Sequence, residues 1–204
     1  MLYDISPPIT PELSVFPGDT SPSREVLLDL KRGDPLTLST WRSTVHVGSH
    51  VDAPSHYGAE APTIEATPLE RCLGPCQVIH VDIACGELID ASLVTTAIES
   101  ERVLFRTATY TDPNTWVPDF AAFAPSSVDA LADRGVKLVG IDTPSVDPST
   151  SKTLDAHLRF LARDMTILEG IVLTDVPAGH YELIALPLKL VGFDASPVRA
   201  VLRG

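Results

Sequence analysis

Residues 45–56 read Val-His-Val-Gly-Ser-His-Val-Asp-Ala-Pro-Ser-His and hold three of the six histidines in the chain. In an extended strand alternate side chains share a face, so His46, His50 and Asp52 point one way and three valines point the other. A helix would place His46 and His50 one turn apart, but β-branched valines and an intervening glycine disfavour it. The pattern therefore predicts a strand with one apolar face and one face of potential metal ligands.

Neutral imidazoles and a carboxylate are typical ligands of divalent metals. On a flat strand, however, neighbouring positions of one face lie roughly 7 Å apart, too far to share an ion. Gly48 can adopt a bend that brings them together, and Pro54 is expected to end strand pairing and turn His56 back over the site. We therefore expect a metal or catalytic site here, the alternative being polar side chains of an ordinary half-buried strand.

Length and composition limit the class of protein. The 204 residues, 44% of them hydrophobic, are expected to form one domain over residues 1–204. No apolar run is long enough for a membrane span, and the N-terminal residues do not resemble a secretory signal, so a cytoplasmic protein is expected. With 27 acidic against 15 basic residues, a net charge of −12 disfavours nucleic acid as a partner. Cys72, Cys76 and Cys85 are expected to be free thiols.

Short elements separated by turns are indicated by 18 prolines, most of them in the connections. The residue patterns predict helices over 92–100, 126–134 and 154–163, the second with a serine cap and a stop at Gly135. Strands are predicted over 24–30, 36–47, 76–83, 102–107, 136–141, 170–173, 182–187 and 198–202. The fold class is therefore α/β, with a mixed sheet and few helices.

Other candidate residues carry less information when taken singly. His157, on a predicted helix, and Glu169, beside a predicted strand, would ordinarily be a surface histidine and a turn carboxylate. His80 and His180 lack ligand neighbours and are expected to be structural or exposed. Three polar residues after the 136–141 strand are expected mainly to cap turns: Asp142, Ser145 and Asp147.

The 46–56 segment resembles the signature His-x-Gly-Thr-His-x-Asp-x-Pro-x-His of the metal-dependent cyclase-like hydrolases, which include bacterial kynurenine formamidases. Ser49 replaces the usual threonine and keeps its hydroxyl. The resemblance extends over essentially the whole chain. The other matching stretches include Ile5-Ser-Pro-Pro-Ile-Thr, Phe16-Pro-Gly-Asp-Thr, Gly140-Ile-Asp-Thr-Pro, Ser151-Lys-Thr-Leu-Asp-Ala-His, Ile167-Leu-Glu and Asp194-Ala-Ser-Pro.

This resemblance implies a swivelling β/β/α fold and a centre of two zinc ions. One zinc would take His46, His50 and Asp52 and the other His157, with Asp52 and Glu169 shared. His56 would be the catalytic acid and base. Other divalent ions such as manganese could compete for the same ligands.

The resemblance also implies a class of substrate. The reaction would be hydrolysis of N-formyl-L-kynurenine to L-kynurenine and formate in tryptophan degradation. Phe16 stands where a substrate-stacking tryptophan is common, and a homodimer is expected. Two alternatives stay open: a related hydrolase acting on another small amide such as isatin, and a zinc-stabilised binding domain without activity. Structural zinc sites are usually closed and rich in cysteine, which favours the catalytic reading.

Overall fold

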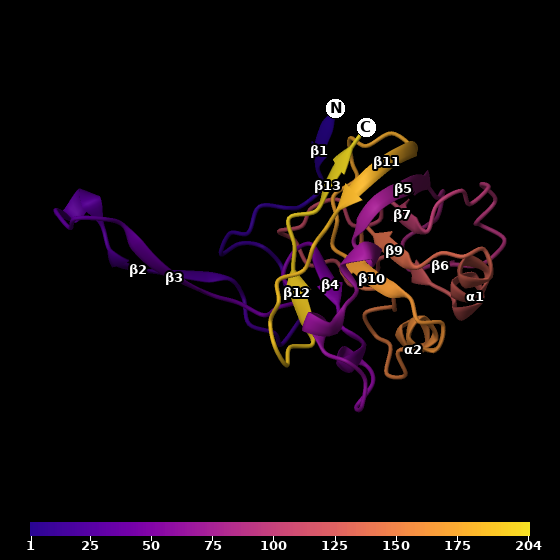
Figure 1. Ribbon diagram of the computed structural model, residues 1–204, viewed down its shortest axis with the longest axis horizontal. Helices are drawn as coiled ribbons and strands as arrows, with labels where there is room; N and C mark the ends of the chain where they lie inside the picture. Colours follow the sequence, from indigo (N-terminus) through magenta and orange to yellow (C-terminus); the bar gives the residue numbers. More distant parts are fainter.

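The computed structural model describes residues 1–204, which are built around one large mixed sheet (Figure 1). Nine strands form this sheet in the order β1-β13-β11-β5-β7-β9-β10-β4-β12. Their bounds are β1 Leu2–Asp4, β4 His50–Asp52, β5 Leu73–His80, β7 Arg102–Arg106, β9 Leu138–Ile141, β10 Thr166–Glu169, β11 Gly179–Ile184, β12 Ala195–Pro197 and β13 Val201–Arg203. The expected α/β class with a mixed sheet and few helices is confirmed.

The centre of the sheet is parallel. Strand β5 pairs with β7, β7 with β9 and β9 with β10, all in parallel, whereas the outer pairs are antiparallel. Every residue of β9 and β10 is buried, as expected for parallel strands covered on both faces. The carboxyl ends of the four parallel strands therefore meet along one edge, where ligand sites of α/β sheets commonly form.

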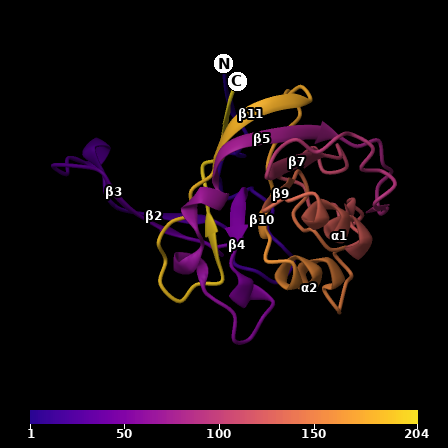
Figure 2. The same ribbon diagram turned by 45° about the vertical axis from the view of Figure 1, so that its right-hand side comes forward.

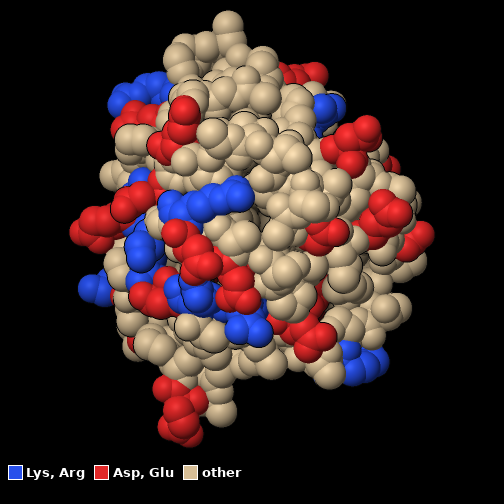
Figure 3. Space-filling model, turned by 90° about the vertical axis from the view of Figure 1, so that its right-hand side faces the viewer, with Lys and Arg blue, Asp and Glu red and all other residues tan.

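Two helices, α1 (Pro125–Asp133) and α2 (Asp155–Ala162), cover one face of the sheet (Figure 2). Val103 and Phe105 of β7 point to this face and pack in one apolar cluster with Leu131 of α1 and Phe160 of α2. Acidic and basic side chains lie interspersed on the outer surface of this side, without a continuous basic area (Figure 3).

The sheet curls around a second apolar cluster on its other face. Leu104, between the two residues that face the helices, belongs to this cluster. So do Leu202 of β13 and Val51 of β4, although these strands lie near opposite ends of the sheet. Alternation along each strand thus supplies two cores, and the curl brings β4 close to the first residues of the chain.

A two-stranded arm projects from the body of the molecule (Figure 1). It consists of β2 (Ser23–Leu28) and β3 (Leu38–Arg42), which pair antiparallel with each other and with no other strand. All their residues except Leu28 are exposed, among them Leu38 and Trp41.

Smaller elements complete the chain. Strands β6 (Leu88–Ile89) and β8 (Ala122–Phe123) form a separate parallel pair. Four 3₁₀ helices lie in connections: Leu30–Arg32, Pro54–His56, Ile64–Ala66 and Leu69–Arg71. Neither α-helix has the length or apolar character to cross a membrane.

The helix predicted over residues 92–100 is absent. The Asp90 carboxylate instead accepts the backbone N–H of Ser92 at 2.6 Å and forms a turn. The side-chain amide of Gln77 then binds the carbonyl of Ala97 and the N–H of Glu99, at 2.9 and 3.0 Å. These long-range hydrogen bonds engage backbone groups that a helix would need, so tertiary contacts override the local pattern.

The strand predicted over residues 170–173 is also wrong, because strand β10 ends at Glu169. Helix α1 lacks the expected serine cap: it begins at Pro125 after Ala124, and the Ser127 hydroxyl instead lies 2.6 Å from the Ile89 carbonyl oxygen. Of the strand predicted over 198–202 only residues 201–202 are in a strand, β13, and the strand predicted over 36–47 is shortened to β3. The remaining predicted strands and the helix over 154–163 are present with shifted ends.

Candidate metal centre and active-site cavity

Strand β4 carries two of the predicted ligands on one face. His50 and Asp52 flank Val51, whose side chain packs in the core on the other face. Before the strand, Gly48 has a φ of +57°, the left-handed conformation that the predicted bend requires. The Nδ1 atom of His50 donates to the Gly48 carbonyl at 2.9 Å, which turns its Nε2 atom toward Asp52.

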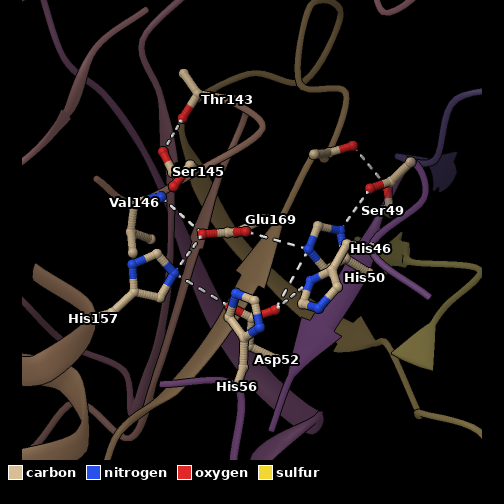
Figure 4. A network of polar contacts seen from close by, with 12 residues as sticks. His46, Ser49, His50, Asp52, His56, Thr143, Ser145, Val146, His157 and Glu169 are labelled. Carbon is tan, nitrogen blue, oxygen red and sulfur yellow. Dashed lines mark hydrogen bonds and ion pairs between the residues drawn. The ribbon is translucent and has the colours of Figure 1, made fainter. Parts of the chain in front are cut away.

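Glu169 reaches the site because β10 lies beside β4. In the antiparallel register Glu169 stands opposite His50, and one of its carboxylate oxygens lies 3.2 Å from Nε2 of His50. The other accepts the backbone N–H of Val146 at 2.7 Å (Figure 4). Gly170 permits the close approach, since a Cβ atom there would lie 2.3 Å from the Gly48 carbonyl oxygen.

His157 enters from α2, on the other side of the cluster. Its Nε2 atom lies 3.4 Å from Asp52 and 3.6 Å from Glu169. The Asp147 carboxylate accepts Nδ1–H of His157 at 2.7 Å, and it also accepts the backbone N–H groups of His157 and Ala156. Asp147 therefore caps α2 and orients its histidine at the same time.

His46 precedes the bend and approaches Asp52 from a third side. Its Nδ1 atom lies 3.1 Å from an Asp52 oxygen, and its Nε2 atom lies 3.0 Å from Asp194, in the loop before β12. A neutral imidazole has one donor and one acceptor nitrogen. One of the two carboxylates beside His46 therefore faces a lone pair unless the ring is protonated, which its raised pKa favours, or a cation lies between them.

His56 ends the 3₁₀ helix that follows Ala53 and lies against the cluster without entering its buried part. Its ring centroid is 4.2 Å from that of His46, and its side chain is 34% exposed, compared with 3% for His50. Burial lowers the pKa of His56, although the charges of Asp52 and Glu169 oppose this. His46, Asp52 and His56 also lie close enough together to share an ion.

The arrangement of these side chains fits a divalent cation. Asp52 has both carboxylate oxygens buried without a hydrogen-bond partner, and Nε2 of His50 is also buried without one. Two carboxylates and several imidazole nitrogens thus converge with their electron pairs toward a common centre, an arrangement that is costly without positive charge. Asp52 lies within 3.5 Å of His46, His50 and His157, so it is suited to a position shared by two ions.

The negative charge of this cluster also raises the pKa of two of its histidines. Burial by itself would lower the pKa of His50, but the carboxylates of Asp52 and Glu169 outweigh it and raise the pKa to about 10. For His157, Asp147 and Asp52 likewise outweigh burial and raise the pKa to about 10. A metal binding at these nitrogens would displace protons.

One cavity of about 500 Å³ contains the cluster and continues to aromatic side chains. His46, His50, His56, His157 and Glu169 line it, and so does Phe16, whose ring packs edge to face on Trp116 with centroids 5.0 Å apart. The structure therefore brings every candidate ligand, His56 and Phe16 to one place. His80 and His180 lie elsewhere, bonded to the Val176 carbonyl and to Glu99.

Sequence reasoning undervalued Asp147 and overlooked Asp194. A turn-capping role was expected for Asp147, but its carboxylate instead caps helix α2 and holds His157. The run of Asp and Ser residues after the 136–141 strand was the available signal. Asp194 lies in one of the stretches that match the family, but no role was assigned to it, because its contact with His46 spans 148 positions of sequence.

Comparison with known proteins identifies the family of this chain. A family model described as "Putative cyclase" matches residues 3–148. The chain belongs to this cyclase family. A kynurenine formamidase of Bordetella petrii is 50% identical over 99% of this chain and 97% of its own length. Similar solved structures of the cyclase fold include one described as a potential metal-dependent hydrolase with cyclase activity, with 29% identity and a TM-score of 0.87 over 99% of this chain and 96% of the other.

An isatin hydrolase has the same fold, with a TM-score of 0.84 over 98% of this chain and 91% of the other. Its sequence identity is 18%, so this similarity concerns the fold alone. The expected swivelling β/β/α architecture of the cyclase family is confirmed by these structures.

Proposed function

We propose that this protein is a kynurenine formamidase, which hydrolyses N-formyl-L-kynurenine to L-kynurenine and formate in tryptophan degradation. The observation that carries the proposal is the convergence of three histidines and Glu169 on the buried Asp52, beside a cavity that His56 also lines. The 50% identity with the Bordetella kynurenine formamidase over nearly the full chain supports the choice of substrate.

The proposed cofactor is a pair of zinc ions. His46, His50 and Asp52 would hold one and His157 the other, with Asp52 and Glu169 shared, because a carboxylate can offer one oxygen to each of two cations. When bound, such ions lower the pKa of a coordinated water and polarise a carbonyl oxygen. The mixed imidazole and carboxylate ligands suit zinc and also admit manganese.

His56 is the proposed acid and base. Amide hydrolysis requires a proton to leave the attacking water and another to reach the departing nitrogen. With its pKa lowered by burial, the His56 imidazole is neutral near pH 7 and can accept the first proton at a ring nitrogen. The partly exposed ring lines the cavity, so the same nitrogen can return a proton to the aniline nitrogen as formate leaves.

Phe16 is the proposed stacking surface for the aromatic ring of the substrate. Its side chain is 42% exposed and lines the cavity, while the edge contact with Trp116 holds the ring in place. A phenyl ring offers less area than the tryptophan common in related enzymes but the same flat apolar face.

We propose a homodimer in which the β2–β3 arm docks on a second copy. An isolated two-stranded hairpin is marginally stable in water, and this one exposes Val26, Leu27, Leu38 and Trp41. The residues before the arm, including Phe16 and Asp19, and His46 after it line the cavity. Docking of the arm would therefore restrict the motion of the cavity-lining residues on either side of it. The proposed location is the cytoplasm, in keeping with three free cysteines.

A substrate panel on metal-analysed protein tests the proposal. We expect kcat/KM for N-formyl-L-kynurenine to exceed those for N-formylanthranilate and isatin, and activity to disappear on chelation and return with zinc. Preference for isatin would support the related-hydrolase alternative. A folded, metal-loaded protein without hydrolysis of any of the three would support the binding-domain alternative and contradict the proposal.

A further inference from the structure

Arg106 is half-buried, and its side chain has no hydrogen-bond or ion-pair partner in the protein. Four arginines are buried or half-buried: Arg71, Arg102, Arg106 and Arg163. Arg71 and Arg163 form ion pairs with acidic side chains, and Arg102 donates to backbone carbonyls. The guanidinium of Arg106 makes no ion pair or hydrogen bond of this kind, yet Arg106 lines the active-site cavity. Partial burial of a cation without a counterion costs free energy that an anionic ligand in the cavity would offset.

Arg106 and the ligand cluster line the same cavity from different strands. It is the last residue of β7, and Glu169 is the last residue of β10, with β9 between them. Two strand spacings separate their backbones by about 10 Å. The register places Phe105 opposite Ile141, which puts Arg106 near the carboxyl edge of the sheet where Glu169 also lies. The same cavity is thus lined by acidic and imidazole groups and by an arginine about two strand spacings away.

The turn after β7 is held firmly. The Asp142 carboxylate accepts the backbone N–H groups of Thr107 and Ala108 at 3.0 and 2.9 Å and the Thr107 hydroxyl at 2.7 Å. Ala108 has a left-handed φ of +57°, so this clamp stabilises an otherwise unfavourable backbone. Both Asp142 oxygens are engaged by the turn and form no ion pair with Arg106. The guanidinium is therefore free to pair with an anionic ligand.

We propose that Arg106 binds the carboxylate of the substrate and so selects aryl formamides that carry an acidic group far from the formyl end. The inference rests on the proposed function, which places the formamide at His56 and the metal ligands. N-formyl-L-kynurenine carries its amino-acid carboxylate on the side chain ortho to the formamide. A guanidinium pairs with a carboxylate through two parallel hydrogen bonds. In a chain with a net charge of −12, a local cation also offsets the repulsion of an anionic group.

The test compares two substrates in Arg106→Gln. One is N-formyl-L-kynurenine, and the other is 2′-formamidoacetophenone, which keeps the formamide and aryl ketone but lacks the amino-acid group. We expect kcat/KM for the first to fall by about 10- to 100-fold, mainly through KM, while kcat/KM for the second changes less than twofold. Arg106→Lys should recover part of the loss. Turnover of the neutral substrate also verifies that each variant is folded.

Lys152 provides the matched control, because it lines the same cavity but is exposed. Lys152→Gln should leave the ratio of the two kcat/KM values within twofold of the wild type. Equal losses with both substrates in Arg106→Gln, no loss with either, or a larger change of the ratio in Lys152→Gln would overturn the assignment. Lack of N-formyl-L-kynurenine hydrolysis by the wild-type protein would instead contradict the proposed function, and the inference with it.

Binding of the product gives a readout independent of catalysis. L-kynurenine should bind Arg106→Gln more weakly than the wild type by about 10-fold or more, as measured by calorimetry. The decarboxylated analogue 2′-aminoacetophenone should bind both proteins equally. Equal L-kynurenine affinities for the two proteins would also overturn the assignment.

Discussion

The carboxylate of Asp147 accepts Nδ1–H of His157 at 2.7 Å and the backbone N–H of the same residue at 2.9 Å. The position and the tautomer of the His157 imidazole are thus set by one carboxylate, which caps the N-terminus of α2 and lies outside the ligand cluster. Nε2 of His157 is left to face Asp52 and Glu169.

Asp147→Asn should weaken metal binding by about 10- to 100-fold, the usual effect of losing a group that orients a histidine ligand. It should also lower the free energy of unfolding by about 1 kcal/mol through loss of the anionic helix cap. Competition with a chelator of known affinity measures the first and urea unfolding the second. Asp155→Asn, in the first turn of the same helix, is the control. Unchanged affinity in Asp147→Asn would show that the orientation does not matter.

Asp52→Ala and Glu169→Ala should each fail to retain two equivalents of metal. Asp52 lies within 3.5 Å of three imidazoles and Glu169 lies 3.2 Å from His50, so either truncation removes oxygens from the centre of the cluster. Elemental analysis after gel filtration measures the content. Glu60→Ala, in an exposed loop, should match the wild type. Two equivalents in both site variants would refute the shared-ligand arrangement.

His56→Ala should keep its metal and lose about 10²- to 10⁴-fold in kcat, the usual contribution of a positioned acid and base. His56 also lies close enough to His46 and Asp52 to act as a ligand, so metal analysis separates the two roles. His180→Ala removes an exposed histidine outside the cavity and should leave kcat unchanged. Loss of metal in His56→Ala would make His56 a ligand, and normal turnover would remove it from the reaction.

Gly170→Ala should destabilise the protein by about 3 kcal/mol or more, because its Cβ would collide with the Gly48 carbonyl oxygen in addition to the strained positive φ. Gly135→Ala is a matched control: its φ is also positive, but a Cβ there meets nothing within 4 Å. We expect it to cost only about 1 kcal/mol. Chemical unfolding compares the two, and equal losses would mean that the close approach of Gly48 and Gly170 contributes nothing.

The double variant Leu38→Ser, Trp41→Ser should convert a dimer into a monomer, since both side chains are exposed on the arm. Light scattering coupled to gel filtration gives the mass, and circular dichroism verifies that the body is folded. Glu25→Ser, on the partner strand of the same arm, should remain dimeric. A monomeric wild type, or a dimeric double variant, would contradict docking of the arm on a second copy.

Local pattern explains why the fold class and the 46–56 segment were predictable. Val51, between His50 and Asp52, defines the two faces of β4, and Gly48 with its positive φ bends the chain before the strand. The same reasoning failed for residues 92–100, where the Gln77 side chain takes the backbone groups of a would-be helix. Local propensity cannot predict a hydrogen-bond partner that lies in a strand elsewhere in the chain.

Residue types and their spacing determined by themselves that this chain would have a strand bearing imidazole and carboxylate groups, and the matching motifs identified its family. Tertiary structure alone decided that Asp194 would reach His46, that Asp147 would hold His157, and that Arg106 would face the same cavity without a partner. These relations depend on which strands lie side by side and how the sheet curls. Such an arrangement results from burial of the whole core, and no short stretch of sequence encodes it.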